Sequence, residues 1–263
     1  MRKKNNLPTN VNELEERIVD LSLQLKSSSN ELILVKENYN KIIGKLIHNL
    51  KNPVGVIFSF SEMMLEDIED YSTEKLKKHI EIIKNSSKFS IELLNTVAKL
   101  SQLKSSDYTL NLKQLNFLNL ISNVVSEFKH LAEYRNITIQ INFPTKPVFL
   151  AVDEAEISLV IRNILNNAFR YSSKNTTITV EVIENNNIVE TTITDEGIGI
   201  SEENLSNVLN EFFVVNTYSE DKQKCIGLGL AVASKICMHH KGKISITSII
   251  DKGSSFKISI PKY

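Results

Sequence analysis

Residues 163–172 read Asn163-Ile164-Leu165-Asn166-Asn167-Ala168-Phe169-Arg170-Tyr171-Ser172, in a segment whose apolar residues recur at helical spacing. On a helix, Asn163, Asn167 and Arg170 would lie within an arc of about 60° beside the apolar face. Amide oxygens and a fixed guanidinium suit Mg²⁺ and phosphate, although such a stripe taken singly is usually a solvated face. This helix therefore indicates either a surface or a nucleotide site, depending on what surrounds it.

Two glycine pairs follow this helix. The run Asp195-Glu196-Gly197-Ile198-Gly199 comes directly after an expected strand, where a carboxylate can accept a hydrogen bond from an exocyclic amine and glycine lets a flat base approach. The same run is also typical of an ordinary turn. The second run, Gly227-Leu228-Gly229-Leu230, opens an expected helix whose free N–H groups and dipole suit a phosphate.

In this order, the three elements resemble the nucleotide-binding domain of histidine kinases, an α/β sandwich of the Bergerat type shared with gyrase-type ATPases. Residues 163–172 are similar to its N box, and the two glycine runs to its two glycine boxes. The resemblance covers about residues 38–263 and implies ATP and Mg²⁺ as ligands, with Asn167 on Mg²⁺ and Asp195 on the adenine amine. The implied nucleotide-binding residues are Asn163, Asn167, Arg170, Tyr171, Asp195, Gly197, Gly199, Lys224, Gly227, Leu228, Gly229 and Leu230, with a lid over about 214–226.

A second resemblance lies in the first half of the chain. The run His48-Asn49-Leu50-Lys51-Asn52-Pro53 is similar to the family's phosphoacceptor box, in which a histidine on a dimerisation helix precedes a proline by five residues. A neutral imidazole is a competent nucleophile at physiological pH. The expected catalytic residues are therefore His48, as the phosphoacceptor, with Asn49 and Asn52.

The residue at position 163 bears on the type of reaction. Gyrase-type ATPases carry a water-activating glutamate one turn before the Mg²⁺-binding asparagine, and this chain has Asn163 there. An amide cannot act as a base, so we expect ATP binding without efficient hydrolysis, as a kinase requires.

Three positions depart from the family pattern. Asn49 follows the histidine where an acidic residue is usual, Cys225 replaces the first glycine of the second box, and Val214 replaces a usual basic residue. Two alternatives to a kinase stay open for this reason. One is a response-regulator phosphatase, because Asn52 is an amide able to position water. The other is a nucleotide-sensing scaffold with weak kinase activity.

The first hundred residues indicate long helices. Heptad spacing predicts a coiled coil, or else one amphipathic helix packed on its own chain. A polar turn before Ser72 or Thr73 predicts a second helix, and two such helices bury their faces best as a dimeric four-helix bundle. The expected domains are a coiled coil (1–37), a dimerisation and phosphotransfer hairpin (38–107) and an ATP-binding domain (108–263). The seam of the coil comprises Leu14, Ile18, Leu21, Leu25, Ser28, Leu32, Val35, Tyr39, Ile42 and Leu46.

The expected third domain alternates strands and helices. We expect strands over 110–115, 137–141, 177–183, 188–194, 243–247 and 255–260, and helices over 117–134, over about 153–171 and from about 227. Pro144 and Pro147 bracket a turn.

Composition indicates which kinds of partner and which compartment to expect. Lys plus Arg equals Asp plus Glu at 31 each, which argues against nucleic acid as a partner. No apolar run approaches the length of a membrane span, and we expect no signal peptide. Cys225 and Cys237 favour reduced thiols. The expected protein is a cytoplasmic homodimer that autophosphorylates His48, passes the phosphoryl group to an aspartate of a response regulator receiver domain, and takes input from an upstream sensor through its coiled coil.

Overall fold

The computed structural model describes residues 11–66, 71–215 and 225–262. The chain divides into two compact units, residues 1–52 and residues 53–263, and each is described by itself. None of the helices within the described ranges has the length and apolar character needed to cross a bilayer.

The first unit is the larger part of one helix, α1 (Val11–Glu66). The helix runs through the serine-rich stretch at 27–30 without a break, so no second helix starts there. Leu14, Ile18 and Leu25 of the expected seam are exposed, at 47%, 63% and 73%. Apolar side chains left in water at heptad spacing are what a coiled coil buries against a second helix, so the dimeric coil stays our prediction.

The second unit opens with the end of α1 and continues into α2 (Thr73–Lys104). Ser72 caps α2, because its side chain accepts a hydrogen bond from the backbone N–H of Lys75 (3.3 Å). This confirms the predicted start of the second helix. Phe60 of α1 meets His79 of α2 edge to face at 4.8 Å, so these segments pack as neighbours.

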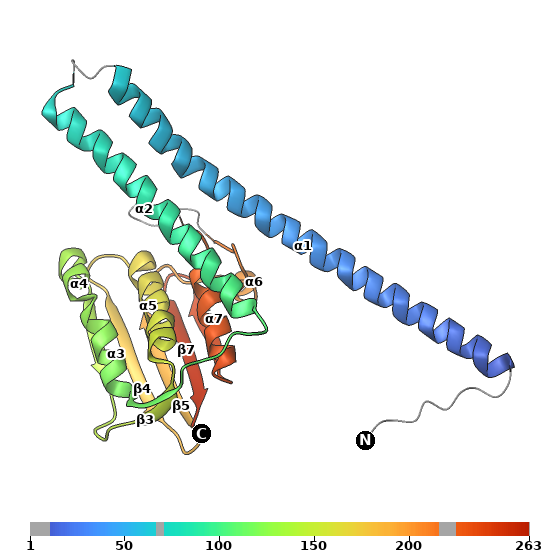
Figure 1. Ribbon diagram of the computed structural model, residues 1–263. Helices are drawn as coiled ribbons and strands as arrows, with labels where there is room; N and C mark the ends of the chain where they lie inside the picture. Colours follow the sequence, from blue (N-terminus) through green and yellow to red (C-terminus); the bar gives the residue numbers. More distant parts are fainter. Residues whose placement is uncertain (1–10, 67–70, 216–224, 263) are drawn as a thin grey trace. The chain divides into compact units, whose positions relative to one another are not determined.

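The rest of the second unit is an α/β sandwich, as predicted. Its main sheet has five strands in the order β2-β4-β5-β7-β6, and β1 pairs with β3 in a separate ribbon. Helices α3, α5 and α7 lie side by side over one face of the main sheet (Figure 1). The strands are β1 (Lys113–Asn116), β2 (Thr138–Asn142), β3 (Phe149–Val152), β4 (Thr177–Glu184), β5 (Ile188–Asp195), β6 (Lys243–Ile249) and β7 (Gly253–Pro261). The helices are α3 (Phe117–Ser126), α4 (Lys129–Arg135), α5 (Glu154–Tyr171), α6 (Glu202–Leu205) and α7 (Gly229–His239).

The core lies between the sheet and these helices. Alternate residues of β4, such as Ile178 and Val180, are fully buried, while the residues between them are half-exposed. The helix α5 buries one continuous stripe that includes Ile161 and Ile164. The apolar face of β4, which repeats every 2 residues, therefore packs against the apolar face of α5, which repeats every 3.6 residues. This layer fixes α5 and the end of β5, which carry most of the candidate site.

Two expected elements differ in extent, and one strand was not expected. The helix expected over 117–134 is broken, because Glu127 and Phe128 separate α3 from α4. The strand expected over 110–115 is only β1, which starts at Lys113. Its partner β3 was not predicted, because the two prolines upstream indicated a turn and the strand has only four residues.

The end of α2 packs against the sandwich. Lys99 forms an ion pair with Glu156 in the first turn of α5. A ring nitrogen of His239 lies 2.8 Å from the carbonyl oxygen of Leu103, and its ring meets Tyr108 edge to face at 4.7 Å. The second helix is thus joined to α5 and α7, the two helices that border the candidate site.

Candidate functional site

Asp195 is the last residue of β5 and is 4% exposed. Its Oδ1 accepts hydrogen bonds from the backbone N–H of Gly197 (2.9 Å) and of Ser254 on β7 (3.2 Å). Burial raises the pKa of Asp195 to about 6, and the two N–H donors partly offset this rise. The two donors leave Oδ2 as the oxygen best placed to meet a ligand. A buried carboxylate of this kind is able to accept a hydrogen bond from a ligand.

The turn after Asp195 packs against the C-terminal end of α5. A Cβ at Gly197 would lie 2.5 Å from the carbonyl oxygen of Tyr171, so only glycine fits there. The next residue, Ile198, donates its backbone N–H to the same carbonyl (3.3 Å). The first glycine run and the end of the N-box-like helix are therefore in direct contact, although about 25 residues separate them in the chain.

The second glycine run opens α7. Gly227 has φ +72°, a left-handed conformation that favours glycine, and its carbonyl accepts the N–H of Phe212 (2.8 Å). Helix α7 then begins at Gly229, and its N-cap residue, Leu228, makes no side-chain capping bond. The first N–H groups of a helix lack partners within it, so this end suits an anion. Phe212 was not among the predicted site residues, although the segment 208–214 resembles the family's F box.

Asn163 links the two helices of the site. Its Nδ2 donates a hydrogen bond to the carbonyl oxygen of Gly229 in the first turn of α7 (3.1 Å). Asn167 and Arg170 follow on α5 and are both half-buried. The structure thus assigns Asn163 a contact that the sequence did not predict, and leaves Asn167 and Arg170 at the helical positions expected of them.

Cys225 occupies the sequence position at which the first glycine of the second box is usual. It is 5% exposed, and its sulfur accepts a hydrogen bond from the hydroxyl of Tyr171 (3.5 Å). Burial, followed by this hydrogen bond, raises the pKa of Tyr171 above its ordinary value, so the phenol remains a donor at neutral pH. This departure from the family pattern therefore adds a bond between α5 and the start of the second run.

The remaining predicted nucleotide residues fall into three groups. Gly199 and Leu230 lie in the glycine runs and are half-buried. Leu228 is 1% exposed, so its side chain belongs to the core and only its backbone can face a ligand. Lys224 lies outside the described residues. Ser254 was missed, because the sequence does not show that β7 lies next to β5.

The predicted phosphoacceptor segment lies on α1. His48 is exposed, Asn49 is half-buried, and Asn52 is exposed one turn after the histidine. The helix continues through Pro53, which is buried. An exposed imidazole on a helix is open to approach by a substrate. The buried His240 instead has a structural role, because its Nε2 accepts the N–H of Asp153 (3.1 Å).

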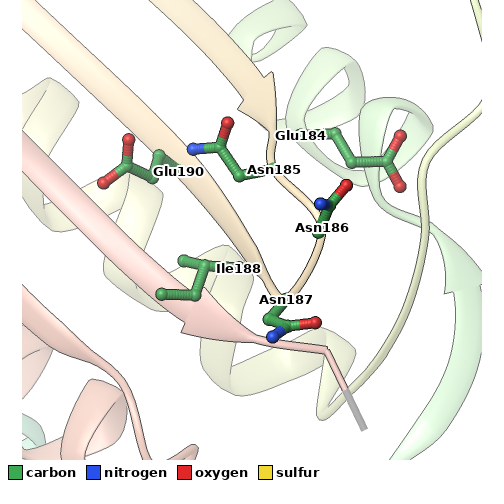
Figure 2. Close-up of a pocket in the computed structure, with 6 residues that line it drawn as sticks. All are labelled: Glu184, Asn185, Asn186, Asn187, Ile188 and Glu190. Carbon is green, nitrogen blue, oxygen red and sulfur yellow. The ribbon is translucent and has the colours of Figure 1, made fainter.

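A polar hollow of about 470 Å³ lies at the β4–β5 hairpin, lined by Glu184, Asn185, Asn186, Asn187, Ile188 and Glu190. Figure 2 shows these side chains around the hairpin turn. The hollow adjoins the first residues of β5, while Asp195 is the last residue of that strand. It is therefore at the opposite end of the strand from the candidate nucleotide site.

Comparison with known proteins supports this geometry. Residues 152–263 match the family described as histidine kinase-, DNA gyrase B-, and HSP90-like ATPase. The match contains α5, both glycine runs and Ser254, so it covers every element of the candidate nucleotide site. The second unit of the chain therefore contains an ATPase domain of this family.

The similarity to individual proteins extends further along the chain. It is 29% identical over 225 residues to the sensor protein KdpD of Clostridium acetobutylicum, covering 85% of this chain and 25% of KdpD. It is 32% identical over 229 residues to the sensor protein RprX of Bacteroides fragilis, covering 86% and 44%. The chain thus spans less than half the length of either relative.

A solved structure of the histidine kinase ThkA in complex with the response regulator protein TrrA has the same fold, with a TM-score of 0.69 at 23% identity. It covers 98% of this chain and 68% of that one. The chain thus shares the fold of a histidine kinase, and its sequence is similar to two sensor proteins and, over residues 152–263, to histidine kinase-type ATPase domains.

Proposed function

We propose that this protein is an ATP-dependent protein-histidine kinase. It phosphorylates His48 and passes the phosphoryl group to an aspartate in the receiver domain of a response regulator. The observation that carries the proposal is the nucleotide site, where a buried carboxylate, a polar helix face and an uncapped helix N-terminus meet. An exposed histidine in a phosphoacceptor-like run supplies the second substrate.

Different residues of the site contact different parts of the nucleotide. Asp195 accepts a hydrogen bond from the adenine amine, and Gly197 leaves room for the base beside it. The N-terminus of α7 faces the phosphates, because its free N–H groups and its dipole favour negative charge. Arg170, on the adjacent face of α5, adds a fixed positive charge. Lys224, in the expected lid, is proposed to add another.

The donor set also fits a magnesium ion. Mg²⁺ prefers oxygen ligands and keeps several waters, so one amide oxygen of Asn167 together with the phosphates is a sufficient set. When bound there, Mg²⁺ neutralises charge that develops on the phosphoryl oxygens. Asn167 is half-buried on α5, one turn beyond Asn163, so its side chain lies on the polar face expected for this ligand.

The transfer itself needs a nucleophile and a leaving group. A lone pair on one ring nitrogen of His48 attacks the γ-phosphorus, a P–N bond forms, and the P–O bond to ADP breaks. The other ring nitrogen keeps its proton, and the ring becomes positively charged. In the second step a carboxylate oxygen of the receiver aspartate attacks the same phosphorus, the P–N bond breaks with its electron pair returning to nitrogen, and the imidazole leaves as the neutral ring that keeps the proton on its other nitrogen.

Asn163 supports transfer over hydrolysis. An amide cannot remove a proton from water, and Nδ2 of this amide already donates to the carbonyl of Gly229. The helix position that supplies a general base in hydrolysing members of the fold is therefore used here to hold α7 against α5.

The proposed partners and compartment rest on the exposed face of α1, the two cysteines and the charge balance. The exposed heptad residues of α1 support a homodimer and an input from an upstream sensor through the coiled coil. Cys225 and Cys237 are buried and form no disulfide, which fits a reducing compartment and supports action in the cytoplasm. The equal numbers of acidic and basic residues argue against nucleic acid as a partner.

A second function, as a phosphatase of the response regulator, is favoured by one observation. Asn52 is exposed one helical turn after His48, so both side chains lie on one face of α1. An amide there could hold a water molecule in line with a phosphorylated aspartate. This activity would share the docking surface of the kinase.

Incubation of the purified chain with γ-labelled ATP tests the proposal. The expected product is labelled protein whose label is stable in alkali and labile in acid, because a phosphohistidine P–N bond breaks once its nitrogen is protonated. The variant His48→Gln should bind ATP and take up no label. Persistent label would place the acceptor elsewhere. Label lost only from a phosphorylated regulator would favour the phosphatase, and neither reaction would leave a nucleotide-sensing scaffold.

A further inference from the structure

We propose that Arg135 is a positioning residue for the nucleotide site, which it shapes from the far side of α5. This inference rests on the proposed function, because it concerns the site that binds ATP. Arg135 ends α4 and is 7% exposed. A buried guanidinium is costly unless its donors are used, so its contacts show what it was placed to hold.

The guanidinium contacts the end of α5. Nη1 donates to the carbonyl oxygen of Phe169, and Nη2 donates to the carbonyl oxygen of Ser172 (3.3 Å). The last carbonyls of a helix have no partner within it, and the C-terminal end of the helix dipole favours a positive charge. Arg135 therefore satisfies this helix end with a fork of fixed geometry, which a lysine could not reproduce.

The same turn of α5 forms one wall of the nucleotide site. Tyr171 lies between the two carbonyls that Arg135 holds. Its own carbonyl packs on Gly197 and accepts the N–H of Ile198, and its hydroxyl donates to Cys225. A shift of this turn would move both glycine runs. Arg135 thus bonds to residues on either side of Tyr171, which contacts the first run directly and Cys225 just before the second.

The fold around Arg135 has other ties that do not touch the site. Asn175 donates its N–H to the carbonyl of Asn136 (2.8 Å), and β2 pairs with β4 from Thr138 onward. These backbone bonds join the end of α4 to the segment after α5. They do not reach the last turn of α5, to which the guanidinium bonds directly.

The experiment compares Arg135→Met with Phe128→Leu. Phe128 stacks on Phe169 at 5.4 Å, so shortening it loosens the same contact with α5 and leaves the carbonyl bonds in place. The affinity for ADP is measured by calorimetry and the Tm by circular dichroism, and the KM for ATP and the saturating rate are taken from label incorporation.

We expect Arg135→Met to raise the Kd for ADP about tenfold, since two charge-assisted hydrogen bonds to one wall of the site are lost. The KM for ATP should rise in parallel, with the saturating rate within about twofold of wild type. Phe128→Leu should lower the Tm and leave the Kd within about twofold of wild type. A role of Arg135 in stability alone would predict the same Kd for both variants at matched Tm.

Unchanged ADP affinity in a folded Arg135→Met protein would overturn the inference while the proposed function stands. If that variant does not fold, Arg135→Gln decides, because the amide keeps one donor: a Kd raised about threefold supports the inference, and an unchanged Kd overturns it. A wild-type protein that binds no ADP would overturn the proposed nucleotide site itself, and this inference with it.

Discussion

Lys99, near the end of α2, forms an ion pair with Glu156 in the first turn of α5, and the two side chains are only 20% and 11% exposed. The pair joins the second helix of the hairpin to the helix that carries the candidate nucleotide residues. Because the pair is largely buried, substitution of one partner should destabilise the fold, since the remaining charge cannot reach water.

The first prediction concerns this pair. Lys99→Met should lower the free energy of unfolding by about 3 kcal/mol, because it leaves the Glu156 carboxylate buried without its cation. Lys88→Met, which breaks the exposed pair Lys88–Glu92 (3.9 Å), should cost less than about 0.5 kcal/mol. Urea unfolding followed by circular dichroism measures both. Equal losses would show that the Lys99–Glu156 pair contributes no more than a surface pair.

The second prediction follows from the raised pKa of Asp195. A carboxyl whose folded pKa lies above its ordinary value favours folding below that ordinary value, and the advantage is lost as the pH rises to about 6. At pH 7 the buried carboxylate therefore costs stability. Asp195→Asn keeps an oxygen for the N–H groups of Gly197 and Ser254, so it should raise the unfolding free energy at pH 7.

The same variant should bind nucleotide less well, which is the third prediction. The ionised carboxylate is the better acceptor for the adenine amine, so wild-type affinity for ADP should fall as the pH drops below about 6. Asp195→Asn should bind ADP more weakly by about 2 kcal/mol at pH 7 and lack this Asp195-dependent fall. Calorimetry at pH 5.5, 6.5 and 7.5 compares the two proteins. Equal affinities at pH 7.5 would reduce this residue to a turn former.

The fourth prediction concerns Asn49. When His48 attacks phosphorus, a neighbouring carboxylate would hold the proton on the second ring nitrogen and stabilise the developing charge, whereas an amide can only orient the ring. Asn49→Asp and Asn49→Glu should therefore raise the rate of autophosphorylation at least about tenfold, with ATP affinity little changed. Single-turnover rates measure this. Rates equal to or below wild type would mean that the site does not lack a base.

The fifth prediction concerns the coiled coil. Removal of residues 1–37 should weaken the dimer without unfolding the remainder, because the exposed seam residues Leu14 to Leu32 lie outside the hairpin. Sedimentation at several concentrations measures the dimer, and circular dichroism serves as the control for folding. Dimerisation as tight as that of the whole chain would place the interface elsewhere.

Much of the fold was predictable, because it depends on local pattern. The helix expected over about 153–171 is α5, which begins one residue later since Asp153 caps it. Alternation likewise located β4 and β5, with the hairpin between them. The ribbon of β1 and β3 was not predictable as a pair, because four-residue strands carry little periodicity and their pairing joins segments far apart in the chain.

The candidate site shows the same division. Residues within one run, such as Asp195 and Gly197, could be grouped from spacing and resemblance. The bond from Ser254 to Asp195 and the bond from Asn163 to Gly229 could not, because each depends on which strands and helices become neighbours in the sandwich. Arg135 gave no signal at all, since a single arginine before a turn is usually a surface residue.

Pro53 lies inside α1, four residues after Asn49. A proline has no N–H, so the carbonyl of Asn49, next to His48, lacks the bond that closes every regular turn of an α-helix. A helix that lacks one backbone hydrogen bond bends and twists more readily at that level. If His48 serves two reactions, its ring must face a nucleotide and later a receiver aspartate. The missing backbone bond would let the helix bend at the level of His48 during that reorientation.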